Sequence, residues 1–250
     1  MSQSSPQIDP SFVRLQLDFA WVLRELIDAP LADILLPNTQ FHRLLGLGRP
    51  DQGPAEGWRP IAEEIDRLDA SDTVEAFLIE SLRSAPPPAP DPNLTLFGCF
   101  ACEKPNASGG VRIHFTHRDP RPGPGPLSRS RLHARRADLI SMIDHLTASE
   151  PLARTIEGAS WLYNTEAYRR IFPADYVSSL KPKAGPRTLT GYSYWGQFID
   201  HQGRLKSGPA HAFRDRFSEL NAEAPWQIFP YQALLASAPL ASFSSVSRSA

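Results

Sequence analysis

LTLFGCFACEKPNASGGVRIHFTH, the stretch at residues 94–117, decides the fold of this chain. It holds two runs rich in aromatic and branched residues, 94–103 and 110–117, on either side of the turn PNAS at residues 105–108. Two such runs around a short polar turn are typical of a β-hairpin. The stretch therefore predicts two antiparallel strands and the beginning of a sheet.

The register favoured by this turn pairs Cys99 with His114 and Cys102 with Val111. Because side chains alternate between the faces of a strand, one face is predicted to be apolar, with Leu94, Leu96, Gly98, Phe100, Cys102, Val111, Ile113 and Phe115. Cys99 and His114 then oppose each other on the other face. An imidazole beside a thiol can lower the thiol's pKa, so both are candidate catalytic residues. The alternative is a small buried cysteine beside a hydrogen-bonded histidine.

Cys99, Cys102, His114 and His117 also have the residue types and spacing of a zinc ligand set. The alternation of the two strands places these residues on two different faces of the sheet, which argues against one shared ion. The sequence therefore predicts no metal site.

Upstream of the hairpin, residues 1–84 are expected to form a helical N-terminal region. Between residues 11 and 28 apolar side chains recur every three or four positions, which indicates an amphipathic helix. Residues 60–68 and 71–84 show similar patterns. The segment APPPAPDPN at residues 85–93 predicts a stiff linker, because proline removes backbone donors and restricts the residue before it.

Downstream of the hairpin, the pattern alternates between helix and strand. The expected elements are a helix at 128–146, a strand at 155–162, short helices at 165–172 and 174–180, a strand at 188–200, a helix at 209–221 and a strand at 228–238. Residues 94–240 would form the core domain and 241–250 a flexible tail. The fold class is α+β, a mostly antiparallel sheet with interleaved helices, preceded by the helical N-terminal region.

The composition is that of a globular protein, with 41% hydrophobic and 21% charged residues. A net charge of −1 gives no global field that would favour nucleic acid or an anionic membrane. No basic, apolar leader and no apolar run of membrane-spanning length occurs, so we expect a cytoplasmic protein without a membrane partner. The preference for Arg over Lys and the 25 prolines are typical of a GC-rich bacterial genome.

A local positive cluster stands out in this neutral chain. It contains Arg112, Arg118, Arg121, Arg129, Arg131, Arg135 and Arg136. A strand, a loop with two glycines and a helix beginning near Ser128 carry it, and the N-terminus of a helix attracts anions. Since Arg binds phosphate and carboxylate in a bidentate way, the first five are candidate ligand-binding residues for a small anion. The alternative is a solvated helix face with its arginines paired to acids.

This strand, loop and helix resemble the pyrophosphate-binding loop of the N-acetyltransferases that use acyl-coenzyme A. The stretch NTEAYRRIF, residues 164–172, looks like another helix of that family. The resemblance implies a transferase with coenzyme A, or another phosphate-bearing cofactor. Pro122, Pro124 and Pro126 depart from the pattern, because each removes a backbone donor from the loop.

An aromatic segment follows between residues 161 and 198. Its aromatic side chains are interleaved with small and polar ones, which suits a ligand pocket as well as a core. The candidate lining residues are Trp161, Tyr163, Asn164, Tyr194, Trp195 and Gln197.

These features predict a small-molecule enzyme, nominally a transferase, or a binder that recognises an anionic ligand through the arginine-rich loop and helix. The alternative is a protein–protein interaction module that docks a partner through its N-terminal helices and aromatic surface. The sequence contains no P-loop, dinucleotide-binding fingerprint, metalloprotease motif or Ser-His-Asp motif, so the reaction type stays open.

Overall fold

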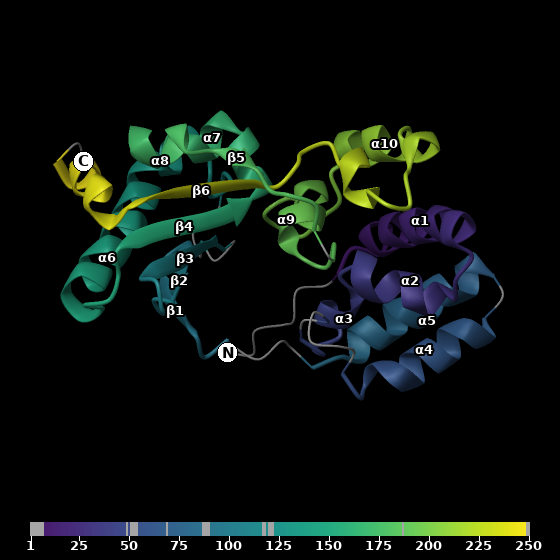
Figure 1. Cartoon of the computed structure of the whole chain (residues 1–250). Helices are drawn as coiled ribbons and strands as arrows, with labels where there is room; N and C mark the ends of the chain where they lie inside the picture. The colour runs from purple at the N-terminus through teal and green to yellow at the C-terminus, as the bar shows by residue number, and fades with distance from the viewer. Residues whose placement is uncertain are drawn as a thin grey trace. The chain divides into compact units, whose positions relative to one another are not determined.

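The structure is a computed structural model that describes residues 8–248, except for residues 49, 51–54, 69, 87–90, 117–118, 120–122 and 187 and the side chains of 245–248. It has the predicted α+β fold, with a helical N-terminal region and a mixed, mostly antiparallel sheet (Figure 1). The chain divides into two compact units. Unit 1 comprises Met1–Ala89 and Ala184–Gln232, and unit 2 comprises Pro90–Lys183 and Ala233–Ala250.

Unit 1 is built from helices. They are α1 (Pro10–Ile27), α2 (Leu31–Asn38), α3 (Phe41–Leu44), α4 (Trp58–Arg67), α5 (Ser71–Ser84), α9 (Tyr192–Trp195) and α10 (Ser207–Arg214). Two residues fix the start of α1. The Asp9 side chain caps the helix by accepting a hydrogen bond from the backbone N–H of Ser11, and Pro10 occupies the first turn.

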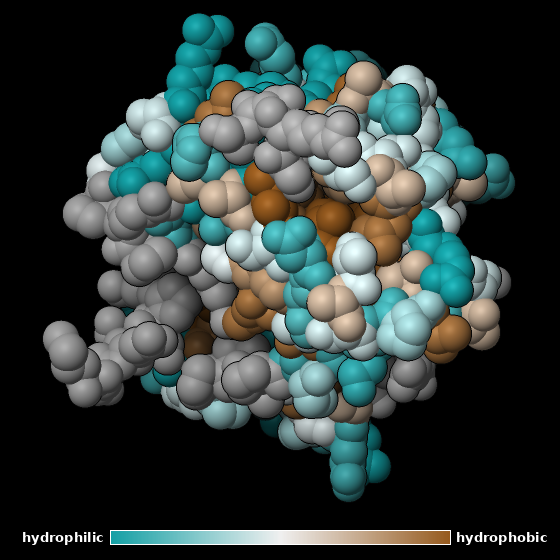
Figure 2. All heavy atoms as spheres, turned by 90° about the vertical axis from the view of Figure 1, so that its left-hand side faces the viewer, coloured by the Kyte–Doolittle hydropathy of each residue, from teal (hydrophilic) through white to brown (hydrophobic). Residues whose placement is uncertain are grey.

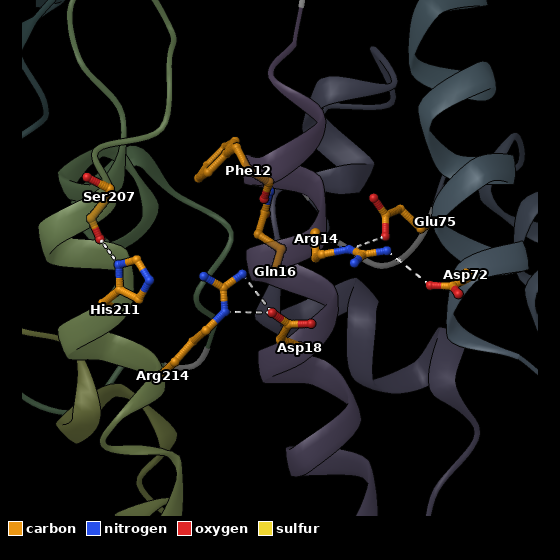
Figure 3. A network of polar contacts seen from close by, with 9 residues as sticks. All are labelled: Phe12, Arg14, Gln16, Asp18, Asp72, Glu75, Ser207, His211 and Arg214. Atoms are coloured by element: carbon orange, nitrogen blue, oxygen red, sulfur yellow. Dashed lines mark hydrogen bonds and ion pairs between the residues drawn. The ribbon is translucent and has the colours of Figure 1, made fainter.

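Polar contacts connect α1 to its two neighbours on opposite sides (Figure 3). Arg14 donates from Nε to Glu75 of α5 at 2.6 Å and from Nη2 to Asp72 at 3.0 Å. Asp18, one turn further on, accepts a 2.7 Å hydrogen bond from Nε of Arg214 in α10. Arg14 and Asp72 are exposed, whereas Glu75, Asp18 and Arg214 are partly buried, and such ion pairs contribute modestly to stability.

The core of unit 1 is aromatic. Trp195 is fully buried, and its ring lies 5.1 Å from Phe229 and 5.5 Å from Phe19, centroid to centroid. Phe213 lies 4.7 Å from both Phe198 and Phe229. Burial of this cluster is the main source of stability in unit 1.

The predicted strand at 188–200 is wrong, because this segment forms α9 followed by a 3₁₀ turn at Gly196–Phe198. The five consecutive residues 194–198 are all buried. A strand would have turned every second side chain away from the core. This segment also groups with unit 1, although the sequence assigns it to the domain at 94–240.

Unit 2 is built around a sheet of strands in the order β1-β2-β3-β4-β6-β5. The strands are β1 (Leu94–Phe97), β2 (Phe100–Glu103), β3 (Gly110–Phe115), β4 (Thr155–Ser160), β5 (Lys181–Pro182) and β6 (Leu234–Pro239). β3 and β4 pair in parallel, connected through the helix α6 (Leu132–Ser149), and the other pairs are antiparallel. The short helices α7 (Glu166–Arg169) and α8 (Ala174–Ser178) follow β4.

One face of the sheet carries the core of unit 2, as the alternation predicts. Phe100, Cys102, Val111 and Ile113 are buried there with Leu139 and other residues of α6. Burial raises the pKa of the Cys102 thiol to about 11, with a smaller contribution from the charge of Glu150. Cys102 therefore belongs to the core of unit 2.

Apolar residues that are only partly covered continue this core towards the surface. They are Phe97, Phe115, Leu127, Leu132, Trp161, Val177, Leu180, Leu234 and Leu240. Figure 2, which looks at the left-hand side of Figure 1, shows hydrophobic atoms gathered in the middle of one face between hydrophilic ones.

The predicted hairpin register is wrong by two residues, since Ala101 pairs with His114 and Cys102 with Ile113. The single strand expected at 94–103 is instead a hairpin, β1 and β2, with Gly98 and Cys99 as its turn. Gly98 adopts φ 56°, and a Cβ there would collide with the carboxylate of Asp138. The turn thus needs glycine. The two-residue shift keeps the side chains of β2 and β3 on their predicted faces. The turn at Gly98 moves Leu94 and Leu96 to the opposite face, because they pair with Glu103 and Ala101.

The C-terminal segment also differs from the expectation of a flexible tail. Residues Leu240–Arg248 form a 3₁₀ helix. Phe243 is buried against Tyr176, with ring centroids 5.3 Å apart. For the proline-rich linker, residues 87–90 lie outside the described part of the chain.

Candidate functional site

The parallel pair β3 and β4 stops pairing before either strand ends. The last paired residues are Ile113 and Gly158, but β3 continues to Phe115 and β4 to Ser160. Each strand keeps its other neighbour over these residues, since Phe115 pairs with Phe100 of β2 and Ser160 with Leu234 of β6. The carboxyl ends of β3 and β4 therefore part from each other.

Two segments that the sequence analysis selected follow these strand ends: the arginine-rich loop and the start of the aromatic segment. After β3 the chain runs through the arginine-rich loop to Ser128, which precedes a 3₁₀ turn (Arg129–Arg131) and then α6. After β4 comes the 3₁₀ turn Trp161–Asn164. Arg129 is exposed and Arg131 half-buried. Arg118 and Arg121 lie outside the described residues.

Inner arginines tie the loop to the helices around it. Arg170 Nη2 donates to the carbonyl of Leu127 at 2.7 Å, and Arg136 Nη2 donates to the carbonyl of Arg170 at 3.1 Å. The Nε atoms of Arg136 and Arg170 are buried and have no hydrogen-bond partner in the described part of the chain. Among the described residues, these two buried donors have no acceptor.

Arg135 is 2% exposed and has a structural role. Its Nη1 lies 3.1 Å from the Asp119 carboxylate and contacts Cys99 Sγ. Its Nε lies 3.1 Å from Asp138 Oδ2, as an ion pair rather than a well-directed hydrogen bond. For this arginine the alternative of pairing with acids is correct.

The proposed opposition of Cys99 and His114 does not occur, because of the shifted register. Cys99 is fully buried in the turn, where its backbone N–H donates to Asp138 at 3.1 Å. His114 contacts Glu103, with Nε2 and Oε1 2.8 Å apart. A catalytic role for either residue stays a prediction, without the paired geometry that suggested it.

Tyr163 belongs to the core of unit 2 and not to a surface. Its hydroxyl lies 2.6 Å from that of Tyr176, directly below Gly158, where a Cβ would collide with both hydroxyls. Burial, and then the neighbouring Tyr176, raise the pKa of Tyr163 well above its ordinary value. Asn164 closes the turn after β4 by donating to the carbonyl of Trp161 at 2.8 Å.

Tyr194, Trp195 and Gln197 belong to unit 1, and so the predicted lining residues divide between the two units. Trp195 Nε1 donates to the carbonyl of Asn38 at 3.1 Å. Gln197 Nε2 donates to the carbonyl of Tyr194 at 2.8 Å, and its Oε1 accepts from the backbone of Tyr231 at 2.9 Å. The indole of Trp195 and the amide of Gln197 therefore have hydrogen-bond partners within unit 1.

Sequence reasoning missed a second cationic site in unit 2. Arg112 lines a pocket of about 650 Å³ together with Lys181 and Lys183. The available signal was that two of only four lysines in the chain lie two residues apart.

No family model, curated protein or solved structure matches this chain. Within the described ranges, no group of three or more His, Cys, Asp or Glu residues could hold a metal ion. None of the described helices is long and apolar enough to span a bilayer.

Proposed function

We propose that unit 2 binds a small phosphate-bearing molecule, such as coenzyme A, at the carboxyl ends of β3 and β4. The observation that carries this proposal is the end of the β3–β4 pairing at Ile113 and Gly158, two residues before each strand ends. In sheets with parallel strands, ligands bind where the carboxyl ends of neighbouring strands diverge.

The charged groups at this edge of the sheet favour the binding of an anion. Arg129 and Arg131 occupy the turn that leads into α6, at the end of the helix where the dipole is positive. Two cations at this end of a helix are locally unfavourable, and a bound phosphate would offset their repulsion. The unsatisfied Nε donors of Arg136 and Arg170 lie in the same region.

A transfer reaction with an acyl-coenzyme A is the activity we propose for such a site. It rests on the resemblance of the strand, loop and helix to acyl-coenzyme A-dependent N-acetyltransferases. The core tyrosines, whose pKa values are raised by burial, have no part in this proposal.

The proposal predicts that coenzyme A stabilises the protein against heat. At a hundredfold excess over its Kd, a ligand adds about 2.7 kcal/mol to the free energy of unfolding. The double variant Arg129→Gln and Arg131→Gln should lose this gain, and the free protein should stay as stable, because both cations oppose the helix dipole. The measurement is a thermal-shift titration with coenzyme A, ADP and inorganic phosphate.

The matched control removes two exposed arginines from α4 of unit 1, through Arg59→Gln and Arg67→Gln. This variant has the same net charge as the test variant and should respond to coenzyme A like the wild type. An equal response of all three proteins, or no response to any anion, would contradict the proposal.

The alternative proposal is that unit 1 docks a partner protein. The observation in its favour is that Leu26 and Ile27, at the end of α1, are 52% and 41% exposed. In the same helix, the buried Nε1 of Trp21 lacks a partner in the described part of the chain, and Trp21 lines a pocket of about 760 Å³. If no anion stabilises the protein, this alternative becomes the better account.

A further inference from the structure

The second face of the sheet in unit 2, opposite the core, holds the pocket of about 650 Å³. Cross-strand pairing brings its residues together. Arg112 of β3 pairs with Glu157 of β4, which pairs in turn with Ser237 of β6. In the next row Ala159 pairs with Leu235, and Leu235 with Lys181 of β5. Strands distant in the sequence thus supply one pocket.

The pocket has a small apolar floor and a polar rim. Ala159 and Leu235 are half-buried. Ser179 on the rim is fixed, because its hydroxyl donates to the carbonyl of Tyr176 at 2.7 Å and accepts from the backbone of Ser237 at 2.8 Å. A volume of this size, with an apolar floor and a few convergent polar groups, is typical of small-molecule sites.

The charge of the pocket is strongly positive. Arg112, Lys181 and Lys183 line it with Glu157 as the only acid among its lining residues. The Glu157 carboxylate leans towards Gly110, since a Cβ on Gly110 would lie 2.5 Å from Glu157 Oε1. Gly110 is two residues before Arg112 on β3, so this acid is turned along the strand and not across the cations.

Two of these cations, Arg112 and Lys183, repel each other. Burial, and then the positive charge of Arg112, lower the pKa of Lys183. The ion pairs found among the described residues of unit 2 involve His114 with Glu103 and Arg135 with two aspartates, and none includes Arg112, Lys181 or Lys183. An anion in the pocket would remove this repulsion.

We propose that this pocket is a binding site for a small organic dianion, a dicarboxylate or a phosphate monoester. Three cations against one acid leave two uncompensated positive charges. Arg112 would bind one oxyanion in a bidentate way, and the two lysines would contact the other charge. The carbon skeleton would lie on Ala159 and Leu235. The site does not use the arginine-rich loop and is independent of the function proposed above.

The experiment is a calorimetric titration of the whole protein with succinate and with glycerol phosphate, and with their uncharged amide and alcohol analogues. We expect at least one of the two dianions to bind and neither analogue to do so. The variant Arg112→Gln should weaken the binding about tenfold or more, the usual effect of losing a charge-assisted contact. Comparing the two dianions distinguishes a carboxylate ligand from a phosphate ligand.

Two further variants test whether binding depends on the shape of the pocket and on its own cations. Ala159→Leu leaves every charge in place but fills the floor, and should weaken binding as strongly as Arg112→Gln. Lys104→Gln removes an exposed cation of the β2–β3 connection, which does not line the pocket, and should leave affinity unchanged. Circular dichroism confirms that each variant is folded.

The same measurements distinguish this pocket from the coenzyme A site proposed at the ends of β3 and β4. The Arg129→Gln and Arg131→Gln variant should bind the dianion like the wild type, whatever its response to coenzyme A. If neither dianion binds, if Arg112→Gln and Ala159→Leu bind as the wild type does, or if Lys104→Gln has an equal effect, the pocket is not a dianion site.

Discussion

The variant Arg135→Met is expected to destabilise unit 2 by about 3–5 kcal/mol, the usual cost of removing one partner from a buried ion pair. The guanidinium holds Asp119 and Asp138, both at 3.1 Å, and contacts the Cys99 thiol in the turn between β1 and β2. The Asp119 side chain is only 7% exposed, so without Arg135 its buried carboxylate would lose this ion pair. Urea unfolding followed by circular dichroism measures the loss.

A matched control is Arg169→Met, which removes an exposed arginine of α7 in the same unit and should change stability by less than about 0.5 kcal/mol. Adding Asp138→Asn to Arg135→Met should recover part of the loss, because one uncompensated charge disappears with it. A loss below about 1 kcal/mol for Arg135→Met would mean that Arg135 is not needed to hold the loop.

The variant Trp195→Ala is expected to destabilise unit 1 by about 3–5 kcal/mol, as large-to-small changes of buried aromatic residues do. Its ring contacts those of Phe12, Phe19, Phe198, Phe213 and Phe229, at centroid distances of 5.1–6.3 Å. The change also removes the hydrogen bond to the carbonyl of Asn38. Guanidinium unfolding measures the effect.

Trp195→Phe retains most of the ring packing and should cost clearly less than the alanine variant. Tyr192→Ala, in the same helix but 48% exposed, serves as the control and should be close to neutral. If Trp195→Ala were as mild as Tyr192→Ala, the core assigned to unit 1 would be wrong.

The fold class and the faces of β2 and β3 could be predicted because they depend on local patterns. Alternation placed Cys102 and Val111 on the buried face, and both are there. The break of the expected strand at Gly98 could not be predicted, because it depends on Asp138 of α6, which is forty residues away in the sequence. A turn that packs against a distant carboxylate leaves little signal in its own residues.

The prediction of a strand at 188–200 was wrong for a different reason. Alternation identifies strands with one buried face, and here consecutive residues from Tyr194 to Phe198 are buried. Periodicity carries no information on such a segment. The buried rings of Tyr194, Trp195 and Phe198 in this segment belong to the core of unit 1.

The proposed site stays a prediction, and only part of it starts from the sequence. The arginine-rich loop and the turn Trp161–Asn164 follow the two neighbouring strands β3 and β4, which the sequence selected separately. The pocket of Arg112, Lys181 and Lys183 was missed, because it exists only through the strand order β3-β4-β6-β5. Non-local pairing of that kind cannot be read from one sequence.

The central claim is that the diverging ends of β3 and β4 hold a phosphate-bearing ligand, and amide NMR of the labelled protein with coenzyme A tests it most directly. We predict the largest shift changes at Phe115 and Thr116, in residues 125–131, and at Ser160–Asn164, with little change in α4. An unchanged spectrum, or changes confined to unit 1, would contradict the account.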